Sequence, residues 1–111
     1  MDIKNLSQLK KALASRHVFV VTDHRNFSER IGERRVVNKM QTNGAYTIIP
    51  NDPDHKISQA NRGLGSWFEF GKAGDWEFAD NGLCTQYLTF SRMGNIERLM
   101  LWQFRVTNEI A

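Results

Sequence analysis

The sequence predicts an α+β protein, in which an N-terminal helix is followed by a mostly antiparallel, barrel-like sheet of six or seven strands. The spacing of apolar residues changes from a helical period over the first fifteen residues to alternation beyond them. Turn signals separate the short β-rich runs, namely Asn43-Gly44, Asp80-Asn81-Gly82 and Met93-Gly94-Asn95. A length of 111 residues suits one domain, so residues 1–111 are expected to share one core.

The helix is predicted over residues 6–15. Either Asn5 or Ser7 is a candidate N-cap, because its side chain can accept a hydrogen bond from a backbone N–H of the first turn. The apolar residues at helical spacing are Leu6, Leu9, Ala12 and Leu13.

The first strands are predicted over residues 17–24, 34–43 and 45–50, which are rich in β-branched and aromatic residues. Asn43-Gly44 between the last two is the strongest hairpin signal in the chain. Residues 51–65 are rich in Asp, Asn, Gly and Pro, which predicts a long exposed loop.

Four more strands are predicted from the segments SWFEF, DWEFAD, LCTQYLTF and RLMLWQFRV. In the last of these, Trp102 and Phe104 alternate with Arg105, which predicts that the two rings belong to the core and that Arg105 lies on the opposite face.

Composition excludes several classes of protein. The chain is 41% hydrophobic and 24% charged, which is typical of a folded protein, and no apolar run approaches the ~20 residues that cross a bilayer, so no membrane partner is expected. Cys84 is the only cysteine, so a reducing cytoplasm is the expected location. The net charge of +3 favours anionic partners weakly. The sequence has no run of five like charges, so nothing in its charge pattern indicates a duplex-DNA binder.

Catalysis is not expected. The NDPDH segment has metal-ligand residue types, but their spacing fits no known zinc or calcium pattern, and turn formation explains them. The GxSxG, P-loop and GxGxxG motifs are absent, and Cys84 lies within a predicted strand as a buried, inert thiol. We therefore expect no enzyme, no cofactor and no metal.

Residues 65–78 carry five aromatic residues among fourteen. Either they form a strand buried on both faces, or one face presents rings to a flat ligand or a second subunit. Rings stack on bases and guanidinium groups pair with phosphates, although most exposed arginines are only solvated charges. The candidate stacking residues are Trp67, Phe68, Trp76 and Phe78, and the candidate phosphate ligands are Arg34, Arg35, Lys72 and Arg105.

The segments NLSQLKKAL, RVVNKMQTNGAY and SWFEFGKAGDWEF together resemble small proteins carried by phages and integrative elements. Among these, the chain resembles the phage anti-Thoeris sponges in size and in its aromatic and arginine content. The resemblance implies sequestration of cyclic ADP-ribose-type signal nucleotides, without catalysis, at sites between subunits. It also implies that Phe78 stacks on the base and that Arg105 binds phosphate.

The sequence thus predicts a counter-defence protein that sequesters a small, cyclic nucleotide immune signal. One alternative is an anti-CRISPR-type inhibitor that blocks a host defence protein such as a nuclease, and another is a single-stranded nucleic-acid-binding module. A homo-oligomer is expected, because seven of the twelve aromatic residues fall between Trp67 and Phe90, more than one small sheet face buries.

Overall fold

The computed structural model describes residues 1–40, 45–50, 66–69 and 75–111, with side chains for 1–37 and 75–111. Its elements, in chain order, are α1 (Leu6–Ala14), β1 (His17–His24), the 3-10 turn η1 (Ser28–Arg30), β2 (Arg34–Met40), β3 (Ala45–Pro50), β4 (Ser66–Glu69), β5 (Asp75–Ala79), the 3-10 turn η2 (Asp80–Gly82), β6 (Leu83–Arg92) and β7 (Asn95–Ile110). The expected turn at 43–44 and loop at 51–65 lie outside the described residues.

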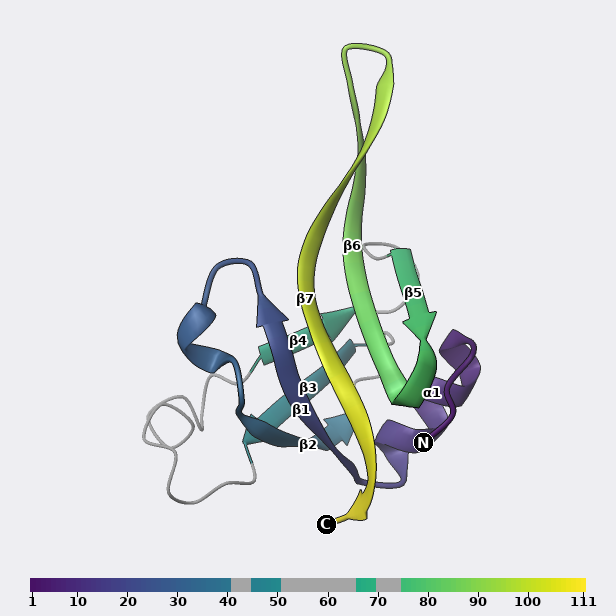
Figure 1. Ribbon diagram of the computed structural model, residues 1–111, viewed down its shortest axis with the longest axis vertical. Helices are drawn as coiled ribbons and strands as arrows, with labels where there is room; N and C mark the ends of the chain where they lie inside the picture. Colours follow the sequence, from purple (N-terminus) through teal and green to yellow (C-terminus); the bar gives the residue numbers. More distant parts are fainter. Residues whose placement is uncertain (41–44, 51–65, 70–74) are drawn as a thin grey trace.

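The strands of the described residues form one antiparallel sheet in the order β4-β3-β2-β1-β7-β6-β5. The last strand in the chain, β7, therefore lies in the middle of the sheet, between β1 and β6 (Figure 1). The predicted α+β class and the antiparallel sheet are confirmed.

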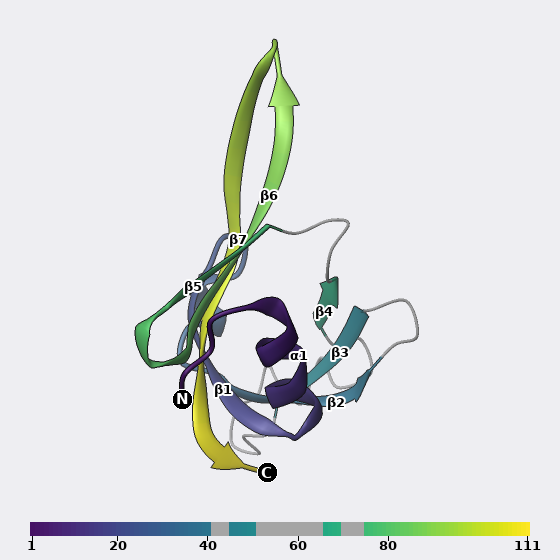
Figure 2. The ribbon, with the colours of Figure 1, turned by 90° about the vertical axis from the view of Figure 1, so that its right-hand side faces the viewer.

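The described strands do not close into a barrel, because β4 and β5 remain the two edges of the sheet. The sheet instead curves around α1, which lies within the curve (Figure 2). A helix is about 10 Å across, whereas an eight-stranded barrel has room only for side chains. The helix therefore occupies the interior that closure would require.

The N-cap prediction for α1 is confirmed at Asn5. Its Oδ1 accepts a hydrogen bond from the backbone N–H of Gln8 at 2.9 Å, which satisfies one of the free donors of the first turn. The helix buries Leu9, Ala12 and Leu13 against the sheet.

We call the face of the sheet that packs against α1 the inner face and the opposite one the outer face. The inner face contributes most of the core, and Phe104 is fully buried there, with its ring centroid 5.0 Å from that of Phe19 and 4.7 Å from that of Trp102. The prediction that Trp102 and Phe104 belong to the core is confirmed. The sheet residues of this core are Phe19, Val21, Val37, Cys84, Trp102, Phe104 and Val106.

The hairpin of β6 and β7 extends beyond the rest of the sheet (Figure 1). Pairing of β5 with β6 stops at Tyr87, whereas β6 and β7 remain paired up to Arg92 and Asn95. We call residues 88–99 the arm. The sequence predicted both strands but not this projection, since the predicted strands stopped at 90 and resumed at 98.

Candidate ligand-binding site on the inner face

A buried ion pair lies on the inner face at the start of β2. Arg35 is 2% exposed and lies opposite Phe19 of β1, and directly opposite residues of an antiparallel pair share a face. Its Nη2 donates a hydrogen bond of 2.6 Å to Oε2 of Glu33, which is fully buried. Burial lowers the pKa of the Arg35 guanidinium, and the neighbouring Glu33 carboxylate opposes this change. The guanidinium nevertheless stays charged, since an arginine pKa lies far above neutral pH.

Backbone hydrogen bonds hold Glu33 in this place. Its N–H donates to the carbonyl oxygen of Arg30 at 3.0 Å, and its own carbonyl accepts from the N–H of Val21, also at 3.0 Å. Gly32 precedes it with a φ of +92°, a conformation that glycine adopts without strain. The tight turn after η1 thus directs an acidic residue into the interior.

His24, at the end of β1, lies beside this pair. Its Nδ1 accepts a hydrogen bond from the N–H of Phe27 at 3.2 Å, and its ring centroid is 6.2 Å from that of Trp102. Burial lowers the pKa of His24, and the positive charges of Arg30 and Arg35 lower it further, with larger effects than the opposing effects of nearby acidic residues.

Aromatic rings form the adjoining wall of the inner face. The indole N–H of Trp102 donates to Oε1 of Gln86 at 2.9 Å, so a buried amide and a buried indole satisfy each other. On β5, the half-buried rings of Trp76 and Phe78 are parallel within 8°, with centroids 6.3 Å apart. The two rings are stacked on each other, and β1, β7 and β6 lie between them and Arg35 of β2.

Three of the predicted site residues lie on the inner face: Arg35, Trp76 and Phe78. Arg34 and Arg105 lie on the outer face, because both are directly opposite Val20 of β1. The eight predicted residues therefore do not form one site.

Both outer-face arginines have protein partners. Arg34 pairs with Glu109. Nη1 of Arg105 donates to the carbonyl oxygens of Asp80 and Asn81, at 3.3 and 2.8 Å. The structure thus gives Arg105 a structural role, holding the η2 turn against β7.

The remaining predicted residues lie where side chains are not described. Trp67 and Phe68 belong to β4, opposite Thr47 and Tyr46 of β3. Lys72 lies outside the described residues.

Sequence reasoning missed Glu33 and His24. Glu33 and Arg35 are opposite charges two residues apart at the start of a strand, and this spacing could have indicated a same-face ion pair. No sequence signal places His24 beside Arg35. In the part of the chain that the structure describes, no group of three metal-ligating side chains occurs.

Cys84 is fully buried, as predicted. Its thiol donates to the carbonyl oxygen of Gly82 at 3.5 Å, and burial raises its pKa to about 12. A thiolate is therefore scarcely populated at neutral pH, so this cysteine is a poor nucleophile.

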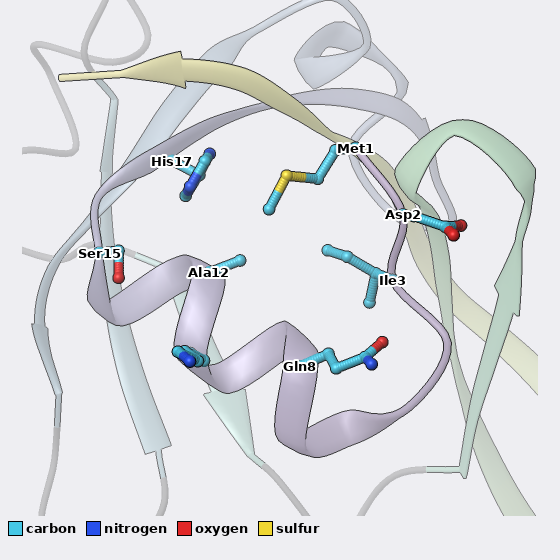
Figure 3. Close-up of a pocket in the computed structure, with 8 residues that line it drawn as sticks. Met1, Asp2, Ile3, Gln8, Ala12, Ser15 and His17 are labelled. Carbon is cyan, nitrogen blue, oxygen red and sulfur yellow. The ribbon is translucent and has the colours of Figure 1, made fainter.

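A separate pocket of about 310 Å³ lies between the N-terminal segment, α1 and the start of β1 (Figure 3). Ile3 and Ala12 form an apolar part of its lining, and Lys11 and His17 contribute polar groups. No predicted ligand residue lines this pocket. The position of the His17 ring is fixed by Thr107, which does not line the pocket: the Nδ1 of His17 lies 2.9 Å from the Thr107 carbonyl oxygen.

No protein-family model, curated protein or solved structure matches this chain. The resemblance to phage proteins therefore remains a prediction from the sequence. Among the described helices, none is both long enough and apolar enough to span a membrane.

Proposed function

We propose that this protein binds and sequesters a small anionic nucleotide on the inner face of its sheet, without catalysis. The observation that carries the proposal is the buried Glu33–Arg35 pair on the aromatic-rich inner face of the sheet. A buried ion pair is a weak source of stability, because desolvation offsets its Coulombic attraction. Buried charges beside rings are, however, typical of ligand sites.

A nucleotide has a phosphate and a base, and the inner face carries a candidate partner for each of them. Arg35 carries a guanidinium, a group that pairs with phosphates, and the hydrogen bond from its Nη2 to Glu33 fixes its position on this face. The parallel rings of Trp76 and Phe78 offer a stacking surface to a base. The curve of the sheet around α1 would place these groups on its concave side (Figure 2).

The biological setting in this proposal comes from the resemblance to phage proteins. A cyclic nucleotide that signals infection would be removed from solution by a homo-oligomeric, cytoplasmic binder. Such a binder needs no nucleophile or general base, and the buried thiol of Cys84 fits that expectation.

Mass spectrometry of ligand released from the denatured protein, after incubation in a lysate with activated defence signalling, tests the proposal. A nucleotide mass in the released fraction, followed by calorimetric titration with that nucleotide, is expected. No nucleotide release and no binding across a cyclic-nucleotide panel would reject the proposal in favour of the protein-inhibitor alternative.

Adjacent arginines provide a matched pair of variants. Arg35→Lys keeps the charge on the inner face but loses the planar guanidinium, so affinity should fall at least tenfold. Arg34→Lys makes the same change on the outer face and should leave affinity unchanged. Equal losses in both variants, with unchanged melting temperatures, would place the site elsewhere.

A further inference from the structure

The arm has a free strand edge whose hydrogen-bonding groups can be assigned. Met93 and Gly94 form a two-residue turn with φ values of +51° and +83°, the positive values that a type I′ hairpin requires. Arg92 and Asn95, which flank such a turn, form a hydrogen-bonded pair, and hydrogen-bonded and non-hydrogen-bonded pairs then alternate along the ladder.

This alternation makes Phe90 and Leu88 hydrogen-bonded to β7, while Ser91 and Thr89 direct their N–H and C=O groups away from it. Tyr87 is the next residue directed away, and it is the residue at which β5 begins to pair with β6. Within the described residues, the backbone groups of Thr89 and Ser91 form the part of this edge that no strand covers.

The two edges of the arm differ in charge. The β6 segment from Leu83 to Ser91 contains no charged residue, and Leu88 and Phe90 are 37% and 36% exposed. The β7 edge carries Glu97, whereas the side chain of Arg98 reaches across β6 to pair with Asp75 and Glu77 of β5. Charged residues on an edge strand oppose pairing with another chain, whereas an uncharged, apolar edge favours it.

We propose that the β6 edge of the arm pairs antiparallel with the same edge of a second copy of this chain, across a two-fold axis at Phe90. In this register Thr89 of each copy pairs with Ser91 of the other. Four intermolecular hydrogen bonds then satisfy every backbone group that these two residues direct outward.

The side chains fit the same register. The two copies of Phe90 become directly opposite in a non-hydrogen-bonded pair, where Cα atoms approach to about 4.5 Å and side chains are closest. Leu88 of each copy lies opposite the aliphatic stem of Arg92. The equivalent two-fold on the β7 edge would place Glu97 opposite Glu97, and like charges directly opposite are destabilising.

The pairing also accounts for the stability of the arm. A two-stranded hairpin is at best marginally stable in water, and the arm extends five paired rows beyond its last neighbouring strand, from Leu88–Leu99 to Arg92–Asn95. Two arms joined along β6 form a four-stranded sheet. This inference concerns oligomerisation and does not depend on the proposed nucleotide.

Light scattering and cross-linking of the full chain test the pairing. The wild-type protein should have about twice the monomer mass of 12.8 kDa at micromolar concentration. Phe90→Lys places two ammonium groups opposite each other and should raise the dimer dissociation constant at least a hundredfold. Ile96→Lys makes the same change at an exposed apolar residue on the other edge, and the dimer should persist.

Engineered cysteines test the register. Phe90→Cys should form an intermolecular disulfide under mild oxidation, because a non-hydrogen-bonded pair has Cα atoms within disulfide range. Ile96→Cys should not. The buried Cys84 does not compete. Thr89→Pro removes an outward N–H without breaking the arm and should also give a monomer.

A monomeric wild-type protein would overturn the proposal, as would a dimer that survives both Phe90→Lys and Thr89→Pro. A dimer that cross-links through position 96 but not through position 90 would likewise overturn it, since the interface would then use the β7 edge.

Discussion

The buried position of the Arg35 guanidinium carries a large desolvation free energy that opposes folding. Transfer of a guanidinium and a carboxylate from water to the interior carries several kcal/mol of desolvation for each ion, which their attraction only partly offsets. Glu33 lowers that cost through a 2.6 Å hydrogen bond. A hydrophobic pair of similar volume is often as stable or more so, so stability alone does not account for this ion pair.

Arg105 provides a test of which face binds. Arg105→Ala removes two hydrogen bonds to the η2 carbonyls and should lower the free energy of unfolding by about 1 kcal/mol, measured by chemical denaturation. Nucleotide affinity should not change, because Arg105 lies on the outer face.

Arg25→Ala, at an exposed residue just after β1, is the control and should change stability by less than about 0.5 kcal/mol. Loss of nucleotide binding by Arg105→Ala, with stability unchanged, would instead support the phosphate role that the phage resemblance implies.

His24 predicts a dependence of stability on pH. Its folded-state pKa lies below the ordinary value of 6.5, because of burial and then Arg30 and Arg35. Between the folded-state pKa and 6.5 the unfolded chain binds more protons than the folded one, so stability is complete above pH 6.5 and falls as the pH drops through the folded-state pKa. Protonation also removes the acceptor for the Phe27 N–H.

The melting temperature should therefore be lower at pH 5.5 than at pH 7.5, and His24→Gln should reduce this difference. His17→Gln, at the other end of β1, is the matched control and should retain it. An unchanged difference in His24→Gln would assign the pH dependence to other groups.

At the scale of the element, local patterns predicted the boundaries near the N-terminus well, whereas the last strand, predicted over 98–106, spans Asn95–Ile110. The strand over 17–24 matches β1, and the helix over 6–15 differs from α1 by one residue. Apolar spacing, caps and turn residues are local signals, and they fix where an element begins and ends. The alternation that separates Arg34 from Arg35 was also readable, but alternation alone does not say which face packs on the helix.

The arm and the site depended on information that local patterns lack. Leu88 and Phe90 alternate as core residues do, and only the end of β5 pairing at Tyr87 exposes them. Likewise, Glu33 and His24 meet because β1 and β2 are neighbours with a particular register. Such meetings follow from strand order, which the sequence pattern did not specify.

Two glycines with positive φ, Gly82 in η2 and Gly94 in the arm, should differ in how well they tolerate a side chain. Gly82 has a φ of +77°, and an added Cβ would lie 2.4 Å from the carbonyl oxygen of Val106. Gly94, in the arm, has a φ of +83° with no heavy atom within 4 Å of the added Cβ among its described neighbours. Gly82→Ala should thus cost strain plus a backbone clash, about 3 kcal/mol, and Gly94→Ala only the strain of about 1 kcal/mol.

Urea denaturation of both variants measures the difference between these costs. Equal losses would mean that η2 moves away from β7 without penalty, and would also weaken the structural role assigned to Arg105.

At the scale of the whole molecule, β7 joins the two halves of the sheet. On one side lie β1 to β4 and on the other β6 and β5, and β7 pairs with both β1 and β6. Of the described strands, β7 is the longest, at 16 residues, and it is the one that connects the β1–β4 half of the sheet to β6 and β5.

That arrangement has a consequence for synthesis on the ribosome. Every other described strand emerges before β7, so the nascent chain holds two incomplete ribbons, each with the edge that β7 will cover still open. Strand pairing between segments far apart in sequence is slow, on the order of milliseconds to seconds. The edge of β6 that β7 later covers is thus exposed during that interval, and neighbouring nascent chains on one messenger are able to pair through it before either chain has finished folding.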